Sequence, residues 1–373
     1  MMIILYISIA FLGVIFIVTL INALTAPLVS HGPHPESTPL VSVLIPARNE
    51  AATLAQTLST LIRQTYDPVE ILVLDDHSTD DTALIVRNFA ERDNRIRLLH
   101  GEALPQGWTG KNWACHQLSQ QAKGDIYIFT DADNFYSPDA VEKTVGWMRK
   151  LNLTLFSAFP QQITETPAEK LVVPVFDTFV YSFLPLWLTY YAPFPSMAAA
   201  NGQWLAMTRE GYQRIGGHDA VRHHIVEDTE LARLTKKQKE RIITASGRGA
   251  VWGRMYSSWR QVYEGFSKNA FGLMGYNAVA FFILISLLFA MYILPYLMLP
   301  FQRFFLPAMA AILLGMSIRL IMAIKYKQPL LVSTLLNPVS IGATLIIAIN
   351  SFKRYLKGSV TWKDRDIYFK TKS

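Results

Sequence analysis

The sequence is poor in cysteine and in charged residues. Its single cysteine, Cys115, excludes an internal disulfide and so allows a reducing, cytosol-facing location. Only 17% of the 373 residues are charged and 51% are hydrophobic, which is unusual for a wholly soluble protein. The chain also lacks zinc-finger, RRM-type and basic-helix patterns, so its net charge of +7 indicates anionic lipid headgroups rather than nucleic acid as the partner.

Long apolar runs lie at both ends of the chain. The first 24 residues carry no charge and are about long enough to span a bilayer. They also lack a basic start and a cleavage site, so we expect a retained transmembrane anchor. A linker with four prolines follows, and three further apolar stretches precede a basic tail. The expected parts outside the soluble domain are an anchor (1–25), a linker (26–39), a C-terminal membrane region (277–350) and a basic tail (351–373).

The C-terminal region poses a problem of topology. It has three apolar stretches, at 277–300, 304–324 and 330–350. If the soluble domain is cytosolic and all three stretches cross the membrane, the basic tail lies outside the cell, against the positive-inside tendency. We therefore expect a re-entrant or interfacial break at Asn337-Pro338. The prediction is a multi-pass cell-membrane protein with its soluble domain facing the cytoplasm. Arg319, inside the second stretch, needs either a lipid phosphate or a neighbouring helix as its partner.

Residues 40–160 alternate between strand and helix patterns. Buried strands are expected at 40–46, 69–74, 96–99, 125–130 and 155–159, and helices at 51–64, 83–90 and 112–123. Such alternation is typical of an α/β domain with a mostly parallel sheet. Neither a Gly-x-Gly-x-x-Gly pattern nor a P-loop is present, so the sequence offers no dinucleotide or P-loop fingerprint.

Two carboxylates follow the strand that ends near Thr130. Asp131 and Asp133 are two residues apart, so on a continuing strand their side chains would share one face. Paired hard oxygen ligands suit Mg²⁺ or Mn²⁺ held together with a substrate phosphate. The alternative is a turn that opens with Asp and Asn.

Three motifs together resemble the family 2 glycosyltransferases of the GT-A fold. They are Val43-Leu44-Ile45-Pro46-Ala47-Arg48-Asn49-Glu50, the run from Asp75 to Thr82, and Asp131-Ala132-Asp133. The resemblance implies an α/β domain of GT-A type over residues 40–270, with a mixed, mostly parallel sheet. It also implies a nucleotide-sugar donor and a divalent cation, Mg²⁺ or Mn²⁺.

The resemblance assigns roles to individual residues. Asp133 would bind the metal, and Asp228 would act as catalytic base with Glu227 beside it. The simpler interpretation of that pair is the acidic first turn of a helix. An exposed lysine or an N-cap aspartate is likewise the simpler interpretation for some donor residues. The residues implied for the donor are Pro46, Arg48, Glu50, Asp75, Asp76, Lys111 and Asp131.

The stretch between Asp133 and Glu227 is unusually aromatic. Residues 170–195 are broken by prolines and predict an interfacial segment within the domain, with a core helix as the alternative. Further along, Ser258-Trp259-Arg260-Gln261 stands where polymer-forming relatives carry Gln-x-x-Arg-Trp, which argues against processive synthesis. The residues expected to contact the acceptor or the diphosphate are Trp204, Arg254, Trp259 and Arg260, although a basic helix that binds lipid headgroups is the plain alternative for the last three.

The expected activity is an inverting hexosyl transfer from a nucleotide sugar, expected to be a UDP-sugar, to a membrane lipid. Residues 360–365 and 109–113 resemble glycosyltransferases associated with carotenoids and hopanoids, which implies an isoprenoid or carotenoid-type acceptor. Ceramide, diacylglycerol and polyprenyl phosphate are alternative acceptors. A processive polysaccharide synthase and a non-catalytic membrane scaffold are alternative functions.

Overall fold

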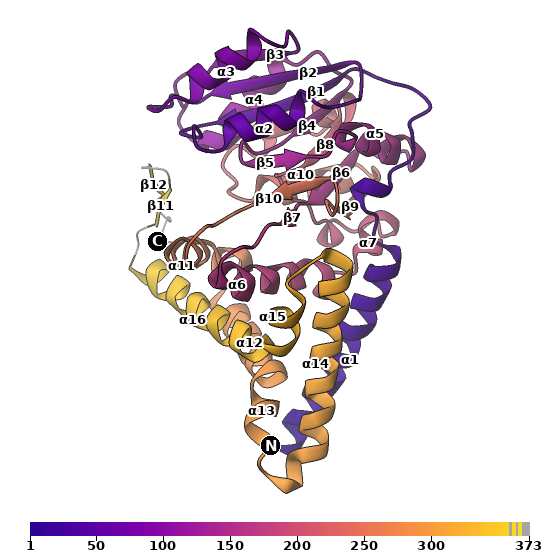
Figure 1. Cartoon of the computed structure of the whole chain (residues 1–373), viewed down its shortest axis with the longest axis vertical. Helices are drawn as coiled ribbons and strands as arrows, with labels where there is room; N and C mark the ends of the chain where they lie inside the picture. Colours follow the sequence, from indigo (N-terminus) through magenta and orange to yellow (C-terminus); the bar gives the residue numbers. More distant parts are fainter. Residues whose placement is uncertain (358–359, 363–364, 368–373) are drawn as a thin grey trace. The chain divides into compact units, whose positions relative to one another are not determined.

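A computed structural model describes residues 1–357, 360–362 and 365–367 (Figure 1). Its internal contacts divide the chain into two compact units. The α/β unit comprises Thr25–Ile163 and Leu186–Arg254, and the helical unit comprises Met1–Leu24, Thr164–Pro185 and Met255–Ser373. The aromatic segment 170–195, expected to lie within one domain, is therefore shared between the two units.

A seven-stranded sheet forms the centre of the α/β unit. Six of its strands run parallel to one another, and β8 runs antiparallel to its neighbours β4 and β6. This confirms the expected mixed, mostly parallel sheet. The strand order is β3 (Ile96–His100), β2 (Val69–Asp75), β1 (Val41–Ala47), β4 (Ile126–Phe129), β8 (Leu205–Thr208), β6 (Leu155–Phe159) and β9 (Ile242–Ser246).

Alternating side chains of the central strands build a hydrophobic core on each face of this sheet. In β1, Val43 and Ile45 face one core and Leu44 the other, as the two-residue period of a strand requires. Helices α2 (Leu54–Leu61), α3 (Thr82–Ala90) and α5 (Ala140–Lys150) cover the first face. Helices α4 (Gly110–Gln121), α8 (Arg209–Arg214) and α10 (Glu227–Lys237) cover the second.

The parallel strands bring several polar loops to one edge. Ala47 pairs with Asp75 at the ends of β1 and β2, and Leu44 pairs with Phe129 at the end of β4. Ligands bind at this carboxyl edge in open α/β sheets. The remaining elements of the unit are a small sheet of β5 (Asn134–Tyr136), β10 (Val251–Gly253) and β7 (Gln161–Gln162), and the short helices η1 (Val29–His31), α7 (Leu186–Tyr191), η3 (Pro195–Met197) and α9 (Gly217–Ala220).

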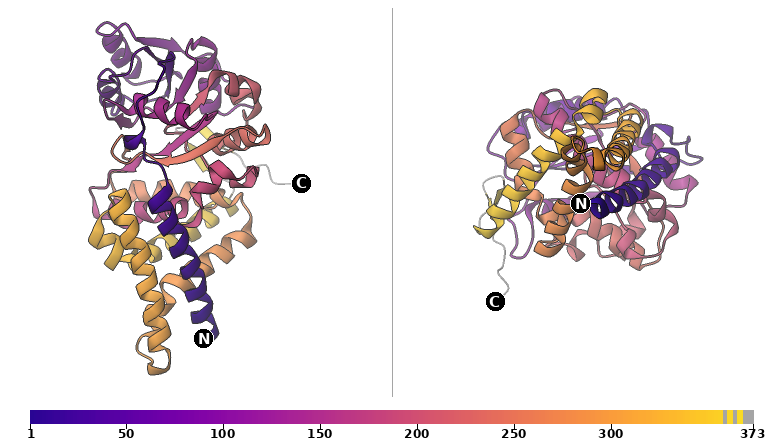
Figure 2. Two further views of the ribbon diagram at one scale, coloured as in Figure 1. Left: turned by 90° about the vertical axis from the view of Figure 1, so that its right-hand side faces the viewer. Right: turned by 90° about the horizontal axis from the view of Figure 1, so that it is seen from below.

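Among its described residues, the helical unit contains two helices long and apolar enough to cross a membrane, judged by length and composition. They are Met2–Thr25, which is α1, and Gln302–Tyr326, which contains α14 (Phe305–Tyr326). Figure 2 shows the helices of this unit from two further sides. Leu12 of α1, Tyr292 of α12 (Ala278–Tyr292), Ile318 of α14 and Ile341 of α16 (Asn337–Leu356) belong to one apolar core. The other elements are α6 (Pro167–Thr178), η2 (Phe179–Phe183), α11 (Trp259–Asn269), η4 (Gly272–Met274), α12 (Ala278–Tyr292), α13 (Leu294–Met298), η5 (Gln302–Phe304), α15 (Leu330–Leu335), α16 (Asn337–Leu356), β11 (Val360–Trp362) and β12 (Arg365–Ile367).

Two of the three expected C-terminal stretches are interrupted. The first is divided into α12 and α13 at Ile293, and the third into α15 and α16. The break between α15 and α16 falls at Leu336, directly before the expected Asn337-Pro338, because proline fits the first turn of a helix better than its interior. The basic tail expected at 351–373 lies partly outside the described residues.

Arg319 in α14 is buried and bonded within the helical unit. Its guanidinium donates to the Pro174 carbonyl at 2.8 Å, to the Thr178 hydroxyl, and through Nε to the Ser333 carbonyl at 3.2 Å. Of the two partners expected for Arg319, the structure therefore supplies neighbouring helices, because α6 and α15 provide the acceptors.

Candidate active site

The loop after β1 is bonded to the loop after β2. Arg48 in the first loop donates from Nη1 to the Asp76 carbonyl at 2.7 Å, and the same atom lies 3.8 Å from the Asp76 carboxylate. Asn49 adopts a left-handed backbone conformation (φ 53°), and its side-chain oxygen accepts the Thr79 N–H at 2.8 Å. The donor residues expected around Pro46, Arg48 and Glu50 therefore lie beside those expected at Asp75 and Asp76.

Asp75 and Asp76 are each only 8% exposed. Asp75 Oδ1 accepts the Ser78 N–H at 3.2 Å and thereby stabilises its own loop. Their expected contacts with the base and ribose of a donor stay predictions.

The strand β4 ends at Phe129, before the two carboxylates. The chain then turns through Ala132 and Asp133 into β5. The two aspartates therefore do not lie on a continuing strand, and the expected reason for their sharing one face does not apply. Thr130 fixes the turn, because its hydroxyl lies 2.6 Å from the Tyr136 hydroxyl and 2.7 Å from the Gln203 carbonyl. Asp131 and Asp133 consequently have different surroundings.

Asp133 has the features of a cation ligand. Its Oδ1 atom is buried and has no hydrogen-bond partner in the described part of the chain. Burial, together with the nearby charges of Asp131 and Glu50, raises the pKa of Asp133 to about 7. A bound cation would compensate the negative charge of this carboxylate. Mg²⁺ is typically held by one or two carboxylates together with substrate phosphates. The donor set at Asp131 and Asp133 fits such an ion.

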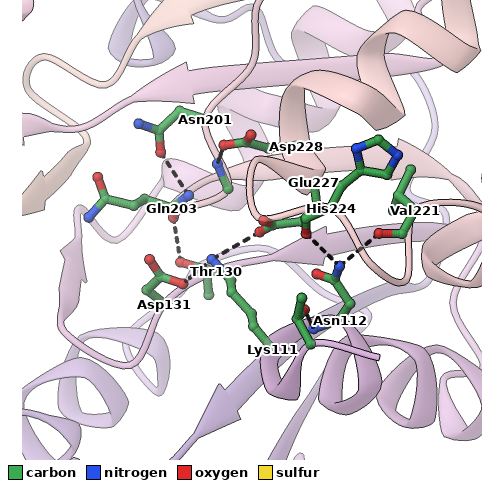
Figure 3. Close-up of polar contacts among 12 residues, drawn as sticks. Lys111, Asn112, Thr130, Asp131, Asn201, Gln203, Val221, His224, Glu227 and Asp228 are labelled. Atoms are coloured by element: carbon green, nitrogen blue, oxygen red, sulfur yellow. Dashed lines mark hydrogen bonds and ion pairs between the residues drawn. The ribbon is translucent and has the colours of Figure 1, made fainter. Parts of the chain in front are cut away.

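Lys111 connects the turn after β4 to the start of α10. Its Nζ lies 2.9 Å from Asp131 Oδ1 and 3.3 Å from Glu227 Oε1 (Figure 3). Although burial lowers the pKa of Lys111, these two carboxylates raise it well above its usual value. The structure therefore brings together an expected donor residue and an expected catalytic residue from distant parts of the sequence.

Asp228 lies in the first turn of α10 and accepts two backbone N–H groups. Gly202 donates to its Oδ2 at 2.7 Å, and Thr229 donates to its Oδ1 at 2.6 Å. Burial, and then the negative charge of Glu227, raise the pKa of Asp228 to about 7. A carboxyl group that titrates near neutral pH is suited to general base catalysis.

A side chain at position 202 would lie against the charged groups of the site. An added Cβ would lie 3.2 Å from both Glu227 Oε1 and Lys111 Nζ, and 3.6 Å from Asp228 Oδ2. The absence of a side chain here lets the backbone approach all three groups closely.

Asn112 is a positioning residue that the sequence did not indicate. Its side-chain amide is fully buried and donates to the carbonyls of Val221 and His224, each at 2.9 Å (Figure 3). These bonds fix the loop that leads to Glu227. The only sequence signal was its place after Lys111, in the first turn of a helix capped by Thr109.

The structure corrects the prediction for Trp204. Its indole is fully buried, donates to the Thr144 hydroxyl at 2.9 Å and packs against Tyr136 with ring centroids 4.9 Å apart. Trp204 precedes β8 and packs into the core on the sheet face that α2, α3 and α5 cover. Its ring is therefore a core side chain and does not face an acceptor.

The remaining expected acceptor or diphosphate residues lie at or beyond the end of the α/β unit. Arg254 is the last residue of that unit and is half-buried. Trp259 and Arg260 begin α11 in the helical unit, where Arg260 forms an ion pair at 2.9 Å with Glu264 one turn along. Their roles stay predictions.

Comparisons with known proteins agree with this geometry. Residues 42–205 match the model of "Glycosyl transferase family 2". The chain is similar to a 4,4'-diaponeurosporenoate glycosyltransferase from Staphylococcus haemolyticus (strain JCSC1435), with 28% identity over 243 residues, or 63% of this chain and 62% of the relative. The protein of the same name from Staphylococcus aureus (strain MRSA252) is 29% identical over 238 residues, or 61% of this chain and 60% of the relative. The match thus spans less than two thirds of the length of these relatives.

A solved structure shows the same fold. Mannosyltransferase PcManGT from Pyrobaculum calidifontis, in complex with GDP-Man and Mn²⁺, has a TM-score of 0.55 and 19% identity, covering 95% of this chain and 99% of that one. The family match, the named relatives and the mixed α/β sheet together show that this chain contains a family 2 glycosyltransferase domain, matched over residues 42–205, with the GT-A fold.

Proposed function

We propose that this enzyme is membrane-bound and inverting, and that it moves a single sugar from a UDP-sugar to an isoprenoid-type lipid acceptor. The observation that carries this proposal is the ion-pair bridge at Lys111, which joins Asp131 at the expected donor end to Glu227 beside Asp228. The names of the relatives, which specify a diaponeurosporenoate acceptor, support the lipid class.

The donor side would occupy the carboxyl edge of the sheet. Asp75 and Asp76 would hold the nucleoside, and Lys111 would move from its carboxylate partners to the diphosphate as a positive point charge. A divalent cation at Asp133 would supply charge neutralisation for the diphosphate as it leaves.

Asp228 would serve the acceptor side of the same site. The Gly202 and Thr229 N–H groups orient its carboxylate, and its raised pKa allows it to accept a proton from an attacking hydroxyl group near neutral pH. Attack on the anomeric carbon from the face opposite the departing diphosphate inverts its configuration. An acceptor that attacks through its own carboxylate has no proton to lose and needs Asp228 much less.

The membrane part of the proposal rests on the apolar helices. Met2–Thr25 and Gln302–Tyr326 have the length and hydropathy of membrane spans. We propose a multi-pass cell-membrane enzyme whose α/β unit faces the cytoplasm, where nucleotide sugars are available.

The test is transfer by the purified full-length enzyme from a panel of nucleotide sugars to total membrane lipid, with Mn²⁺ or with a chelator. We expect one labelled lipid product, formed only with the metal. Asp133→Asn should abolish the metal response, and the exposed Glu91→Gln serves as a matched control. Transfer that continues in chelator would refute the role of Asp133, and products of increasing length would indicate a polysaccharide synthase instead.

A further inference from the structure

The α/β unit carries a run of exposed apolar side chains next to its edge strand. Along α7 and η3, Trp187 is 37% exposed, Tyr191 76%, Phe194 62% and Met197 36%. We call these four residues the aromatic strip. Soluble surfaces rarely gather such side chains without a binding partner, and Trp and Tyr are enriched where proteins meet the lipid–water boundary.

The aromatic strip lies close to the end of the first apolar helix, because short chain segments connect them. Helix α1 ends at Thr25, and Leu28 forms a β-bridge with Ser246 at the end of β9. The three residues from Thr25 to Leu28 span at most about 10 Å. Helix α7 packs on the same strand, and the Thr244 N–H donates to the Thr189 hydroxyl at 3.2 Å. A bilayer spanned by α1 would therefore lie near α7.

The aromatic strip also leads to the proposed catalytic base. Beyond Tyr191, the chain follows α10: Lys236 near the end of that helix donates to the Ala192 carbonyl, and Gly202 donates to Asp228 at its start. Only four residues lie between Met197 and Gly202.

Basic side chains accompany the aromatic strip. Lys237 in the last turn of α10 and Arg241 just before β9 are both exposed, and the Arg241 guanidinium lies 5.9 Å from the ring centroid of Tyr190 in α7. Aromatic groups together with cations are the composition that binds anionic phospholipid headgroups.

We propose that the aromatic strip inserts into the headgroup layer of an anionic phospholipid bilayer and so holds the Asp228 end of the site at the membrane surface. The benefit for catalysis rests on the proposed function, since it concerns a lipid acceptor. The insertion itself does not depend on which substrate the enzyme uses.

A matched control lies at the opposite edge of the sheet. Leu84 in α3 is 53% exposed, comparable to the aromatic strip, and α3 packs on β3. Six strand spacings separate β3 from β9, which is about 29 Å at ~4.8 Å each. Leu84 should therefore remain in water when the aromatic strip is in lipid.

The experiment uses spin labels on the full chain in nanodiscs of 70% phosphatidylcholine and 30% phosphatidylglycerol. Cys115 is buried, so Phe194→Cys, Tyr191→Cys and Leu84→Cys can each be labelled singly, with the unsubstituted protein as the blank. Power saturation then compares collisions with oxygen, which concentrates in lipid, and with a water-soluble nickel chelate.

We expect labels at 191 and 194 to collide at least fivefold more with oxygen relative to nickel than the label at 84. Equal nickel accessibility at all three positions would overturn the proposal. So would labels at 191 and 194 that are shielded from both reagents, since that result means contact with protein. Lipid immersion without any sugar transfer to lipid would refute the proposed function and leave this inference standing.

Discussion

Replacing Asp228 by asparagine tests the acceptor side of the site. Asparagine keeps the size of the side chain and can still accept the Gly202 N–H, which lies 2.7 Å from Asp228 Oδ2, but it cannot take a proton at neutral pH. A positioned general base contributes about 10²–10⁴-fold to the rate. At about 1.4 kcal/mol for each factor of ten, this is roughly 3–6 kcal/mol of barrier. We therefore expect turnover of a hydroxyl acceptor to fall by about 10²–10⁴-fold.

The pH dependence gives a second, independent measure of the same role. The base acts when ionised, and burial and Glu227 raise the pKa of Asp228 to about 7. Turnover should therefore reach a plateau above pH 7 and fall about tenfold per unit below it. Glu227→Gln removes the negative charge that helps to raise the pKa of Asp228, so the midpoint of the pH–turnover curve should move to lower pH. Asp228→Asn should abolish this titration.

The assay compares two acceptors that share one isoprenoid chain and end in a hydroxymethyl or a carboxylate group. Measurements at saturating Mn²⁺ keep Asp133, whose pKa is also raised to about 7, in its ionised form. We expect a large loss for Asp228→Asn with the alcohol and only a few-fold loss with the acid, which has no proton to remove. Glu91→Gln controls for the loss of a carboxylate elsewhere. Full activity of Asp228→Asn with the alcohol would refute the assignment of Asp228 as base.

Three further predictions concern neighbouring residues. Lys111→Ala should weaken binding of a nucleoside diphosphate by about 10- to 100-fold, since a hydrogen bond to a charged group contributes about 1.5–3 kcal/mol. Lys111 also lowers the pKa of Asp228, so the pH midpoint of turnover should rise in this variant. An unchanged midpoint would exclude that coupling. Asp133→Asn should abolish Mn²⁺ binding measured by electron paramagnetic resonance in the presence of UDP, whereas retained binding would place the metal elsewhere. Trp204→Ala should destabilise the α/β unit by about 3–5 kcal/mol, measured by chemical denaturation, because it empties a buried site; a stable variant with impaired acceptor binding would contradict its placement in the core.

The order of strands and helices in the α/β unit could be predicted because each strand is a compact hydrophobic run. The predicted strand at 69–74 and helix at 83–90 match β2 (Val69–Asp75) and α3 (Thr82–Ala90) to within one residue. The position of β8 between β4 and β6, with reversed direction, could not be predicted, since strand order depends on contacts between distant segments. The three-residue strands β5 and β10 are too short to show a period.

In the helical unit, composition alone was misleading. Residues 277–300 are continuously apolar, but the helix ends at Tyr292 and a new one starts at Leu294, just before Pro295. Hydropathy reports how apolar a stretch is and not where its backbone hydrogen bonds are interrupted. The Asn337-Pro338 break could be predicted because proline itself marks it.

The chemistry of the site was predictable from residue types, but its assembly was not. Asp131, Asp133 and Asp228 stand in recognisable acidic patterns, because carboxylates are the groups expected to bind a ribose or a divalent cation and to accept a proton. Lys111 and Asn112 show their importance only when α4 meets the start of α10, where one side chain bridges two acids and the other binds the loop before them. Because Lys111 contacts both Asp131 and Glu227, movement of Lys111 on donor binding would change the charge around Glu227 and hence the pKa of Asp228. The proposed base would thereby respond to occupancy of the proposed donor site, which would limit premature reaction with water.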